Sequence, residues 1–248
     1  LALTGCETTE EIEYTERPVG DLYNEALDAL ESGNNNEASQ LFDEVERQHP
    51  YSPWAKKAQL MSAYAYYQAN EYEEGIAALD RFIRLHPANP DVPYAQYLKG
   101  LCYYEQISDV ARDQQVTIEA RAAFEELLNR YPDSPYSRDA ALKLDLIRDH
   151  LAGKEMEIGR FYLRTGHYLA AINRFKTVVE VYQTTTHTPE ALHRLVEAYS
   201  AIGLESEARK VAALLGHNFP GSEWYIDTYE VVENTPIREP EESWYKFW

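Results

Sequence analysis

The sequence of 248 residues is poor in basic side chains and in cysteine. Lysine and arginine number 23 against 42 acidic residues, so the formal net charge is −19. Phosphate backbones and anionic lipid headgroups are bound through clustered cations, so this composition argues against both as electrostatic partners. There is also no apolar run near 20 residues, which excludes a transmembrane helix. The two cysteines, Cys6 and Cys102, are not expected to form a disulfide, because Cys102 lies in an apolar helical run where it serves as a small core residue.

Motifs that would indicate catalysis are also absent. The chain has no G-x-S-x-G, no phosphate-binding glycine loop, no H-E-x-x-H and no paired cysteines. His187 and His193 lie near each other in "HTPEALH", but a zinc site needs three or four convergent ligands. We therefore expect no enzymatic activity, no metal and no cofactor other than a covalent lipid.

That lipid is predicted from the first six residues, "LALTGC". The Leu-x-Gly-Cys pattern is typical of the end of a bacterial lipoprotein signal peptide, so Cys6 is the predicted lipidation site. Residues 1–5 would be residual signal peptide and residues 6–18 an acidic tether. A chance Gly-Cys is the alternative. A multiply acylated cysteine holds a protein at a membrane almost permanently, because each buried methylene contributes about 0.8 kcal/mol.

The body of the chain repeats one pattern, a small residue followed at fixed spacing by a large one, an apolar one and a proline. Five segments fit, at Ala38/Phe42/Val45/Pro50, Gly75/Leu79/Phe82/Pro87, Ala120/Phe124/Leu127/Pro132, Ala171/Phe175/Val178 (with Gln183 in place of proline) and Ala208/Ala212/Leu215/Pro220. The small residue lets two helices approach and the proline ends the second helix. Four segments upstream carry a small or apolar residue three positions before a tyrosine, which predicts a partner helix.

This phase is typical of tetratricopeptide repeats, in which each unit is a pair of antiparallel helices. The predicted fold is all-α: a right-handed superhelical array of five such repeats with a long connecting helix over 135–165. A loop is expected around "SDVARDQQ" (108–115). Ser52, Ser134 and Thr188 are predicted as helix N-caps, each followed by a proline at the first helical position.

In such arrays the first helix of each repeat lines a concave groove. The predicted groove residues in repeats one to three are mostly aromatic: Tyr23, Leu27, Leu60, Tyr64, Tyr67, Tyr94, Tyr97, Leu101 and Tyr104. Tyrosine suits a groove for apolar or aromatic segments, since it stacks and still offers a hydroxyl. The alternative is that many of these tyrosines are core filler. Repeats four and five offer a more polar groove that includes Arg160, His193 and Glu197, which suits a folded partner.

These features divide the chain by function. Residues 19–134 are predicted to form the substrate groove, residues 135–221 the partner-docking part, and residues 222–248 an acidic, aromatic C-terminal tail. Any role of the aromatic residues in that tail, at a partner or at a membrane surface, stays open.

Two long segments resemble a known family. "YAYYQANEYEEGIAALDRFIRLHP" (64–87) and "ARAAFEELLNRYPDSPY" (120–136), behind the Leu-x-Gly-Cys motif, are similar to the BamD lipoproteins of the outer-membrane β-barrel assembly machinery. The resemblance covers roughly residues 3–220. It implies a lipid anchor at the periplasmic face of the outer membrane and recognition of unfolded outer-membrane proteins.

The resemblance also implies partners. It implies association with the β-barrel assembly subunit through that subunit's periplasmic repeat domains, and it leaves room for other assembly lipoproteins. Arg174 in "NRF" matches a partner-contacting arginine of the family, and we predict that Arg160 joins it in docking. Local pairing of Arg174 with an acid is the alternative. The predicted function is a non-enzymatic, lipid-anchored adaptor; the rival is an envelope scaffold lipoprotein that coordinates cell-wall enzymes.

Overall fold

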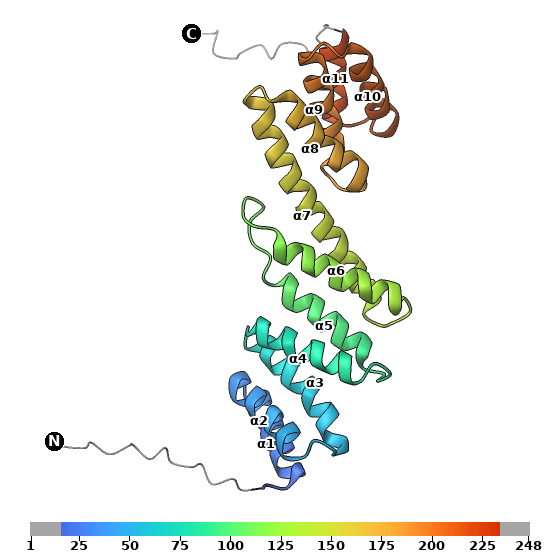
Figure 1. Ribbon diagram of the computed structural model, residues 1–248. Coiled ribbons are helices and arrows are strands. Elements are labelled where there is room, and N and C mark those ends of the chain that lie inside the picture. Colours follow the sequence, from blue (N-terminus) through green and yellow to red (C-terminus); the bar gives the residue numbers. More distant parts are fainter. Residues whose placement is uncertain (1–15, 234–248) are drawn as a thin grey trace, which may run out of the picture. The chain divides into compact units, whose positions relative to one another are not determined.

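The computed structural model describes residues 16–233, and this part of the chain consists of α-helices and the turns that join them (Figure 1). Its eleven helices are α1 (Val19–Glu31), α2 (Asn35–Gln48), α3 (Pro53–Gln68), α4 (Tyr72–Leu85), α5 (Val92–Tyr104), α6 (Gln115–Arg130), α7 (Ser137–Arg164), α8 (Tyr168–Val181), α9 (Thr188–Ala201), α10 (Glu205–Asn218) and α11 (Glu223–Glu233). Cys6 and the aromatic residues 244–248 lie outside the described residues.

The all-α, tetratricopeptide type of fold is confirmed. The helices α1 to α10 follow one another as five helix pairs at the predicted positions. The chain divides into two compact units, an N-terminal unit up to Cys102 and a C-terminal unit from Tyr103 onward. The functional division at residue 134 concerns binding and stays a prediction, as does the superhelical course of the array, because that course would span both units.

Within four of the five pairs, the turn between the two helices closes in the same way. A residue with positive φ follows the first helix: Gly33 (82°), Asn70 (60°), Gly166 (77°) or Gly203 (76°). The next backbone N–H then bonds back to the last turn, as from Glu71 to the Tyr66 carbonyl at 2.9 Å. This is a Schellman closure, which favours glycine or asparagine at the left-handed position. The third pair instead has a longer connection over residues 105–114, where the sequence predicts a loop.

The corners between pairs also share one geometry. Each second helix ends at a His, Tyr or Phe whose φ lies between −118° and −135°. Two consecutive turns follow, as where the Ser52 N–H bonds the His49 carbonyl and the Ala55 N–H bonds the Ser52 carbonyl, both at 3.0 Å. The same pair of bonds recurs after His86, Tyr131, Tyr182 and Phe219. The repeated sequence punctuation is therefore one structural device used five times.

One of the three predicted N-caps is confirmed and two are wrong. Ser52 caps α3 and accepts a hydrogen bond from the Trp54 N–H at 3.2 Å. Helix α7 begins only at Ser137, because Ser134 belongs to the corner turn and its hydroxyl lies 2.8 Å from the Ser137 hydroxyl. Thr188 is the first residue of α9, and its hydroxyl donates backward to the Tyr182 carbonyl at 3.2 Å.

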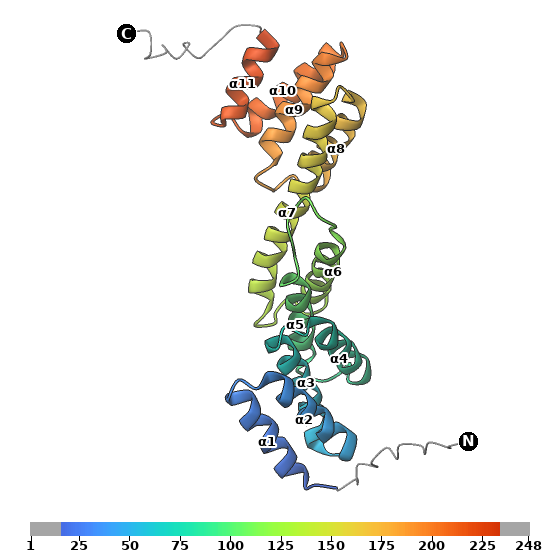
Figure 2. The same cartoon turned by 90° about the vertical axis from the view of Figure 1, so that its left-hand side faces the viewer.

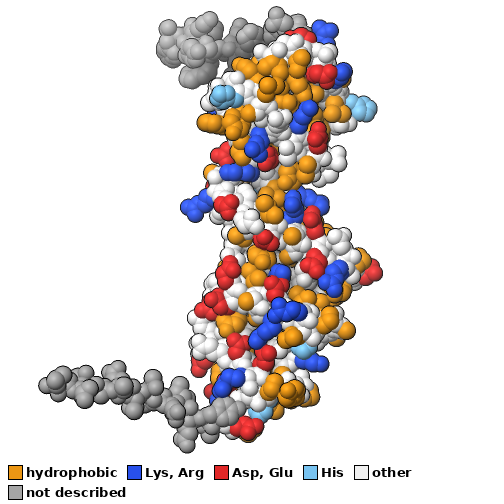
Figure 3. All heavy atoms as spheres, viewed as in Figure 1, with side chains coloured by type: hydrophobic (Ala, Val, Ile, Leu, Met, Phe, Trp, Pro, Cys, Tyr) orange, Lys and Arg blue, Asp and Glu red, His pale blue; other side chains and the backbone are white. Residues whose placement is uncertain are grey.

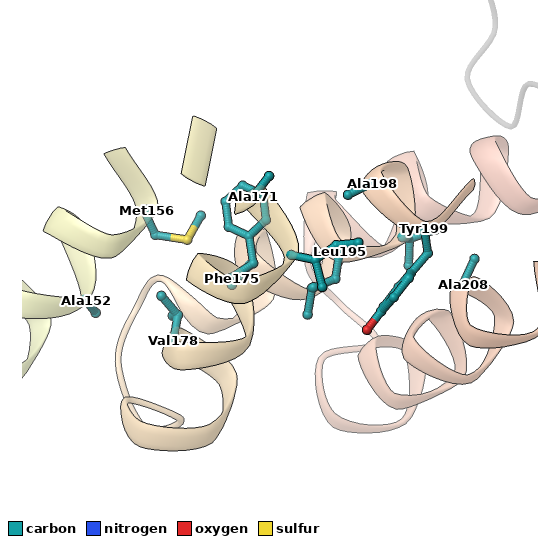
Figure 4. Packing of buried hydrophobic residues seen from close by; sticks show 12 residues of the cluster. Ala152, Met156, Ala171, Phe175, Val178, Leu195, Ala198, Tyr199 and Ala208 are labelled. Atoms are coloured by element: carbon teal, nitrogen blue, oxygen red, sulfur yellow. The ribbon is translucent and has the colours of Figure 1, made fainter. Parts of the chain in front are cut away.

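The predicted long helix is confirmed as α7, a 28-residue helix that starts two residues later than expected. Its N-terminal half packs on α6 and its C-terminal half on α8. Close approach to α8 depends on Gly159, where a Cβ atom would stand 2.4 Å from Cε1 of Phe175. Figure 4 shows Phe175 in the buried cluster that also holds Met156, Leu195 and Tyr199.

The segment predicted as a tail from residue 222 begins with a helix. After the fifth corner, residues Glu223–Glu233 form α11, which packs against both α9 and α10 (Figure 2). The corner explains this result, since in the four earlier cases the same pair of turns leads into the first helix of the next pair. The acidic composition of the segment concealed an apolar face that includes Trp224 and Val232.

Candidate binding surfaces

The N-terminal unit carries a tyrosine-rich stripe on the first helices of its repeats. On α3, Lys57, Leu60, Tyr64 and Tyr67 follow the three- and four-residue spacing that places side chains on one helix face. Leu60 is 9% exposed, whereas Tyr64 and Tyr67 are half-buried. Half-buried rings are fixed by their neighbours and still present surface, which a peptide-binding face requires.

The equivalent positions of α5 continue this pattern. Tyr94, Tyr97 and Leu101 are all half-buried and belong to the same unit. Tyr104, the last residue of α5, belongs to the C-terminal unit, where its ring lies 6.5 Å from Phe124 and 4.9 Å from the Lys143 Nζ. Its packing therefore ties Tyr104 to α6 and α7, and its predicted role in the groove stays untested.

At α1 the predicted groove residues lie deeper than expected. Tyr23 is only 2% exposed, and its ring centroid lies 5.4 Å from Phe42 and 4.8 Å from Trp54. Leu27 is half-buried against the same core. Tyr23 is therefore a core residue that supports Trp54, which is 42% exposed at the start of α3. The sequence prediction missed Trp54, although the corner motif "PYSPW" points to it.

Hydrogen bonds to α2 orient α3 on the side opposite Tyr64 and Tyr67. The Ser62 hydroxyl donates to Asp43 Oδ1 at 2.6 Å and the Tyr66 hydroxyl to Oδ2 at 2.8 Å. Burial, together with the bond to Asp43, raises the pKa of Tyr66 to about 12. These links join α2 to α3, on the side away from Tyr64 and Tyr67, and so hold the stripe outward.

A second network joins α2, α3 and α4. The Gln59 Nε2 donates to Glu46 Oε1 at 2.6 Å, and Gln59 Oε1 lies 2.9 Å from His86 Nε2. Arg81 completes it with an ion pair to Glu46 at 2.7 Å. Burial, aided by the charge of Lys56, lowers the pKa of His86. The fold therefore favours the neutral imidazole.

The first helices of the C-terminal unit are joined by ion pairs instead. Arg160 of α7 meets Glu190 of α9 through two bonds, Nε to Oε1 at 2.8 Å and Nη2 to Oε2 at 2.5 Å. Arg194 adds a bond to Glu197 at 2.8 Å. Burial alone would raise the pKa of Glu190, but the bonds and charges of Arg160 and Arg194 outweigh it and lower that pKa. In turn, the bonds that Arg160 donates to Glu190 raise the pKa of Arg160.

Helix α11 covers the face of α9 where a polar groove was expected. His193 is 4% exposed, and its Nδ1 lies 2.8 Å from the Thr228 hydroxyl. Trp224 stacks near His193 at 5.4 Å and beneath the Arg194 guanidinium at 5.3 Å. His193 therefore lines no open groove: the prediction failed here because it treated α11 as a tail.

The two predicted docking arginines differ in their availability. Both Nε and Nη2 of Arg160 are committed to Glu190. Within the described residues, Arg174 of α8 bonds to a carboxylate only through Nη1, which donates to Glu155 at 3.0 Å. Its side chain is 43% exposed. The local pairing that was the alternative is thus present. Arg174 still presents surface to a partner, so it is the better candidate of the two.

Two other kinds of feature are missing from residues 16–233. This part of the chain holds no group of three or more His, Cys, Asp and Glu side chains placed to hold a metal ion. None of the helices in the same range combines the length and apolarity that crossing a membrane requires. The described surface mixes charged and hydrophobic side chains along its length, as Figure 3 shows for one face.

The helix pairs define a protein of the tetratricopeptide-repeat type. Its first helices carry a tyrosine-rich face in one unit and an ion-paired face in the other. A family described as outer membrane lipoprotein, YfiO, matches residues 15–214. The chain belongs to this family.

Individual relatives extend over most of the chain. A protein of Caulobacter vibrioides named outer membrane protein assembly factor BamD is 55% identical over 225 residues, which cover 91% of this chain and 74% of the relative. A BamD of Rickettsia prowazekii is 45% identical, with 94% and 93% covered. A BamD of Neisseria meningitidis serogroup A is 34% identical, with 100% and 96% covered.

Proposed function

We propose that this protein is a lipid-anchored adaptor that acts in the assembly of outer-membrane β-barrel proteins. The observation that carries the proposal is its similarity, over nearly the whole chain, to relatives named outer membrane protein assembly factor. Acylation of Cys6 would anchor it at the periplasmic face of the outer membrane. The protein would act by binding and positioning, without catalysis.

The N-terminal unit would take an extended segment of an unfolded outer-membrane protein. Its support is the stripe of half-buried tyrosines on α3 and α5, with Trp54 at the start of α3. Aromatic side chains at this depth contribute large contact area with little loss of conformational entropy. The stripe is held outward by hydrogen bonds on its opposite side.

The C-terminal unit would dock the β-barrel assembly subunit through that subunit's periplasmic repeat domains. Arg174 supports this step because it is partly exposed and retains donor nitrogens beyond its bond to Glu155. A carboxylate of the partner could pair with Arg174 as Glu155 does. Arg160 would contribute indirectly by keeping α7 and α9 in register.

The experiment separates binding of an unfolded outer-membrane protein from docking of the β-barrel assembly subunit. Tyr64→Ala combined with Tyr97→Ala is expected to weaken binding of an unfolded outer-membrane β-barrel protein on the order of tenfold, with docking of the assembly subunit unchanged. Arg174→Glu should do the reverse. Tyr51→Ala is the matched control, because Tyr51 is fully exposed and lies off the stripe. Both affinities are measured by fluorescence anisotropy, with thermal unfolding to verify folding.

Equal losses in both assays would contradict the assignment of capture and docking to separate units. The rival function, an envelope scaffold, is tested by purifying the native lipidated protein with its partners. Recovery of a large outer-membrane β-barrel protein supports the proposal. Recovery of cell-wall enzymes without such a protein overturns it.

A further inference from the structure

The C-terminal unit has an apolar pocket that the proposed function does not use. It lies where the α7–α8 turn meets the α9–α10 turn and has a volume of about 620 Å³. Its lining is largely aromatic and aliphatic: Tyr162, Gly166, His167, Tyr168, Leu169, Ala170 and Ile202. Leu169 is 70% exposed, and the neighbouring Phe161 and Leu204 are 53% and 44% exposed. Such a concentration of exposed apolar side chains indicates a surface that something covers.

Helix α11 ends at the end of the C-terminal unit where this pocket lies. It runs antiparallel to α10, since Tyr225 lies against Gly216 near the end of α10 while Val232 shares a groove with Arg209 near its start. Figure 2 shows the last turn of α11 at the end of the unit that carries the α9–α10 turn. The chain therefore leaves the described structure near the start of α10, which follows the turn that holds the pocket residue Ile202.

The residues that follow have the chemistry to fill the pocket. Residues 244–248, "WYKFW", contain four aromatic side chains in five positions. Residues 234–243 lie between them and α11, and ten residues span up to about 35 Å when extended. Among the intervening residues, Glu239, Glu241 and Glu242 outnumber Arg238, and Arg164, two residues before the pocket residue Gly166, is exposed and makes no ion pair within residues 16–233.

We propose that the aromatic segment 244–248 of the same chain docks into the pocket formed by Tyr162, His167, Tyr168, Leu169 and Ile202. A tethered segment meets its site at an effective concentration in the millimolar range, which favours it over a free ligand of equal affinity. A second groove borders α11 itself and is lined by Arg209, Ala212, Ala213, Gly216, Tyr225, Thr228, Tyr229 and Val232. Arg209 and Thr228 make its lining more polar than that of the first pocket, so it serves as the internal comparison.

Disulfide trapping in the full 248-residue chain tests this docking. Lys246→Cys leaves all four aromatic residues intact, and Ala170→Cys places a thiol in the pocket. Cys6→Ser removes the N-terminal thiol, while Cys102 is buried and its pKa is raised to about 12, so it stays unreactive. We expect the 170–246 disulfide to form on the order of tenfold faster than in the same chain with residues 244, 245, 247 and 248 all changed to serine.

Three outcomes would overturn the proposal. An unchanged rate after the serine substitutions would show that the tether alone brings the thiols together and leaves the pocket to another partner. An equal rate with Ala213→Cys in place of Ala170→Cys would show no preference between the two grooves. Crosslinks between two differently tagged chains, one carrying Ala170→Cys and the other Lys246→Cys, that rise with concentration would assign the pocket to a second copy. Each variant is verified by thermal unfolding. The result does not depend on the proposed function, whose assays use other residues.

Discussion

The two units are built from the same helix pairs and corners, but polar side chains join their helices on different faces. In the N-terminal unit the polar links run from α2 to α3 and on to α4, through Asp43, Glu46 and Gln59. The C-terminal unit keeps one such link, from Arg174 on α8 to Glu155 on α7, but it adds an ion pair between first helices, from Arg160 on α7 to Glu190 on α9. A further link joins His193 of α9 to Thr228 of α11.

This difference decides which first-helix face remains open. In the N-terminal unit the polar links lie on the side of α3 that packs on α2. The opposite side of α3, with Tyr64 and Tyr67, can therefore accept a ligand. In the C-terminal unit the ion pair between Arg160 and Glu190 occupies the corresponding side of α7 and α9. Helix α11 covers the part of α9 around His193. Repeats of one architecture can thus be specialised by moving the polar contacts from one side of the first helix to the other.

The largest expected effect tests whether the units are separate in stability. Phe42→Ala in the N-terminal unit and Phe175→Ala in the C-terminal unit each remove a ring that is 0% exposed. Each is expected to cost about 3–5 kcal/mol through lost burial and a residual cavity. Because repeats contact only their neighbours, each loss should stay within its own unit.

Hydrogen exchange followed helix by helix checks this first prediction. Phe42→Ala should speed exchange in α1 and α2 and leave α8 and α9 unchanged, and Phe175→Ala should do the opposite. Phe161→Ala is the control, since Phe161 is 53% exposed and its removal should change stability by no more than about 0.5 kcal/mol. Equal acceleration throughout the chain in either core variant would mean that the two units unfold as one.

The next effect compares the two kinds of polar link. Arg160→Ala leaves Glu190, whose side chain is 12% exposed, with only the longer contact to Arg194 at 3.5 Å. We expect a loss of about 1–3 kcal/mol, since an uncompensated buried charge is costly. Tyr66→Phe removes one of two donors to Asp43, which keeps its bond from Ser62, so about 0.5–1.5 kcal/mol is expected.

Urea unfolding measures both variants, with Glu190→Gln added to form a double-mutant cycle. The cycle isolates the coupling between Arg160 and Glu190 from the cost of leaving one partner alone. A larger loss of unfolding free energy from Tyr66→Phe than from Arg160→Ala would contradict the expectation that these variants test. That expectation is that the ion pair between Arg160 and Glu190 contributes more to stability than the hydrogen bond between Tyr66 and Asp43.

The helices could be predicted from the sequence because their signals are local. The alternation of small and large residues predicts the helix pairs, and the absence of proline between Pro135 and Pro189 predicts the long α7. The N-caps at Ser134 and Thr188 were wrong because the same two-turn corner consumes a different number of residues before each helix begins. Helix α11 was missed because acidic residues dilute its apolar positions.

The binding faces were predicted less well, since they depend on contacts between residues far apart in sequence. Tyr23 fits the spacing of a groove residue, but Trp54 of the next repeat covers it. Arg160 and Glu190 are 30 residues apart, and no local pattern indicates that they pair. The spacing of a residue along its helix therefore indicates which way its side chain points. The exposure of that side chain is set by the neighbouring repeat.

The smallest expected effect separates the units by pH. Because burial lowers the pKa of His86 below its usual 6.5, the unfolded N-terminal unit binds more protons than the folded one in this range. Its stability should therefore fall as the pH drops below 6.5. In the C-terminal unit, Glu190 and Glu197 have lowered pKa values, so the stability they contribute is retained above about pH 4.5 and lost below it.

Tryptophan fluorescence can follow the two units separately, because Trp54 lies in the N-terminal unit and Trp224 in the C-terminal unit. Chains that keep only one of these two tryptophans, with Trp244 and Trp248 both changed to phenylalanine, are unfolded in urea at several pH values between 6.5 and 4.5. The urea midpoint reported by Trp54 should fall as the pH drops through this window. His86→Tyr should flatten the fall, since Tyr131 shows that a tyrosine fits the equivalent corner position. Glu190→Gln should leave the Trp54 profile unchanged. A fall of the Trp224 midpoint as steep as that of Trp54 would show that the pH response does not arise from His86, because Glu190 and Glu197, whose pKa values are lowered, remain ionised in this window.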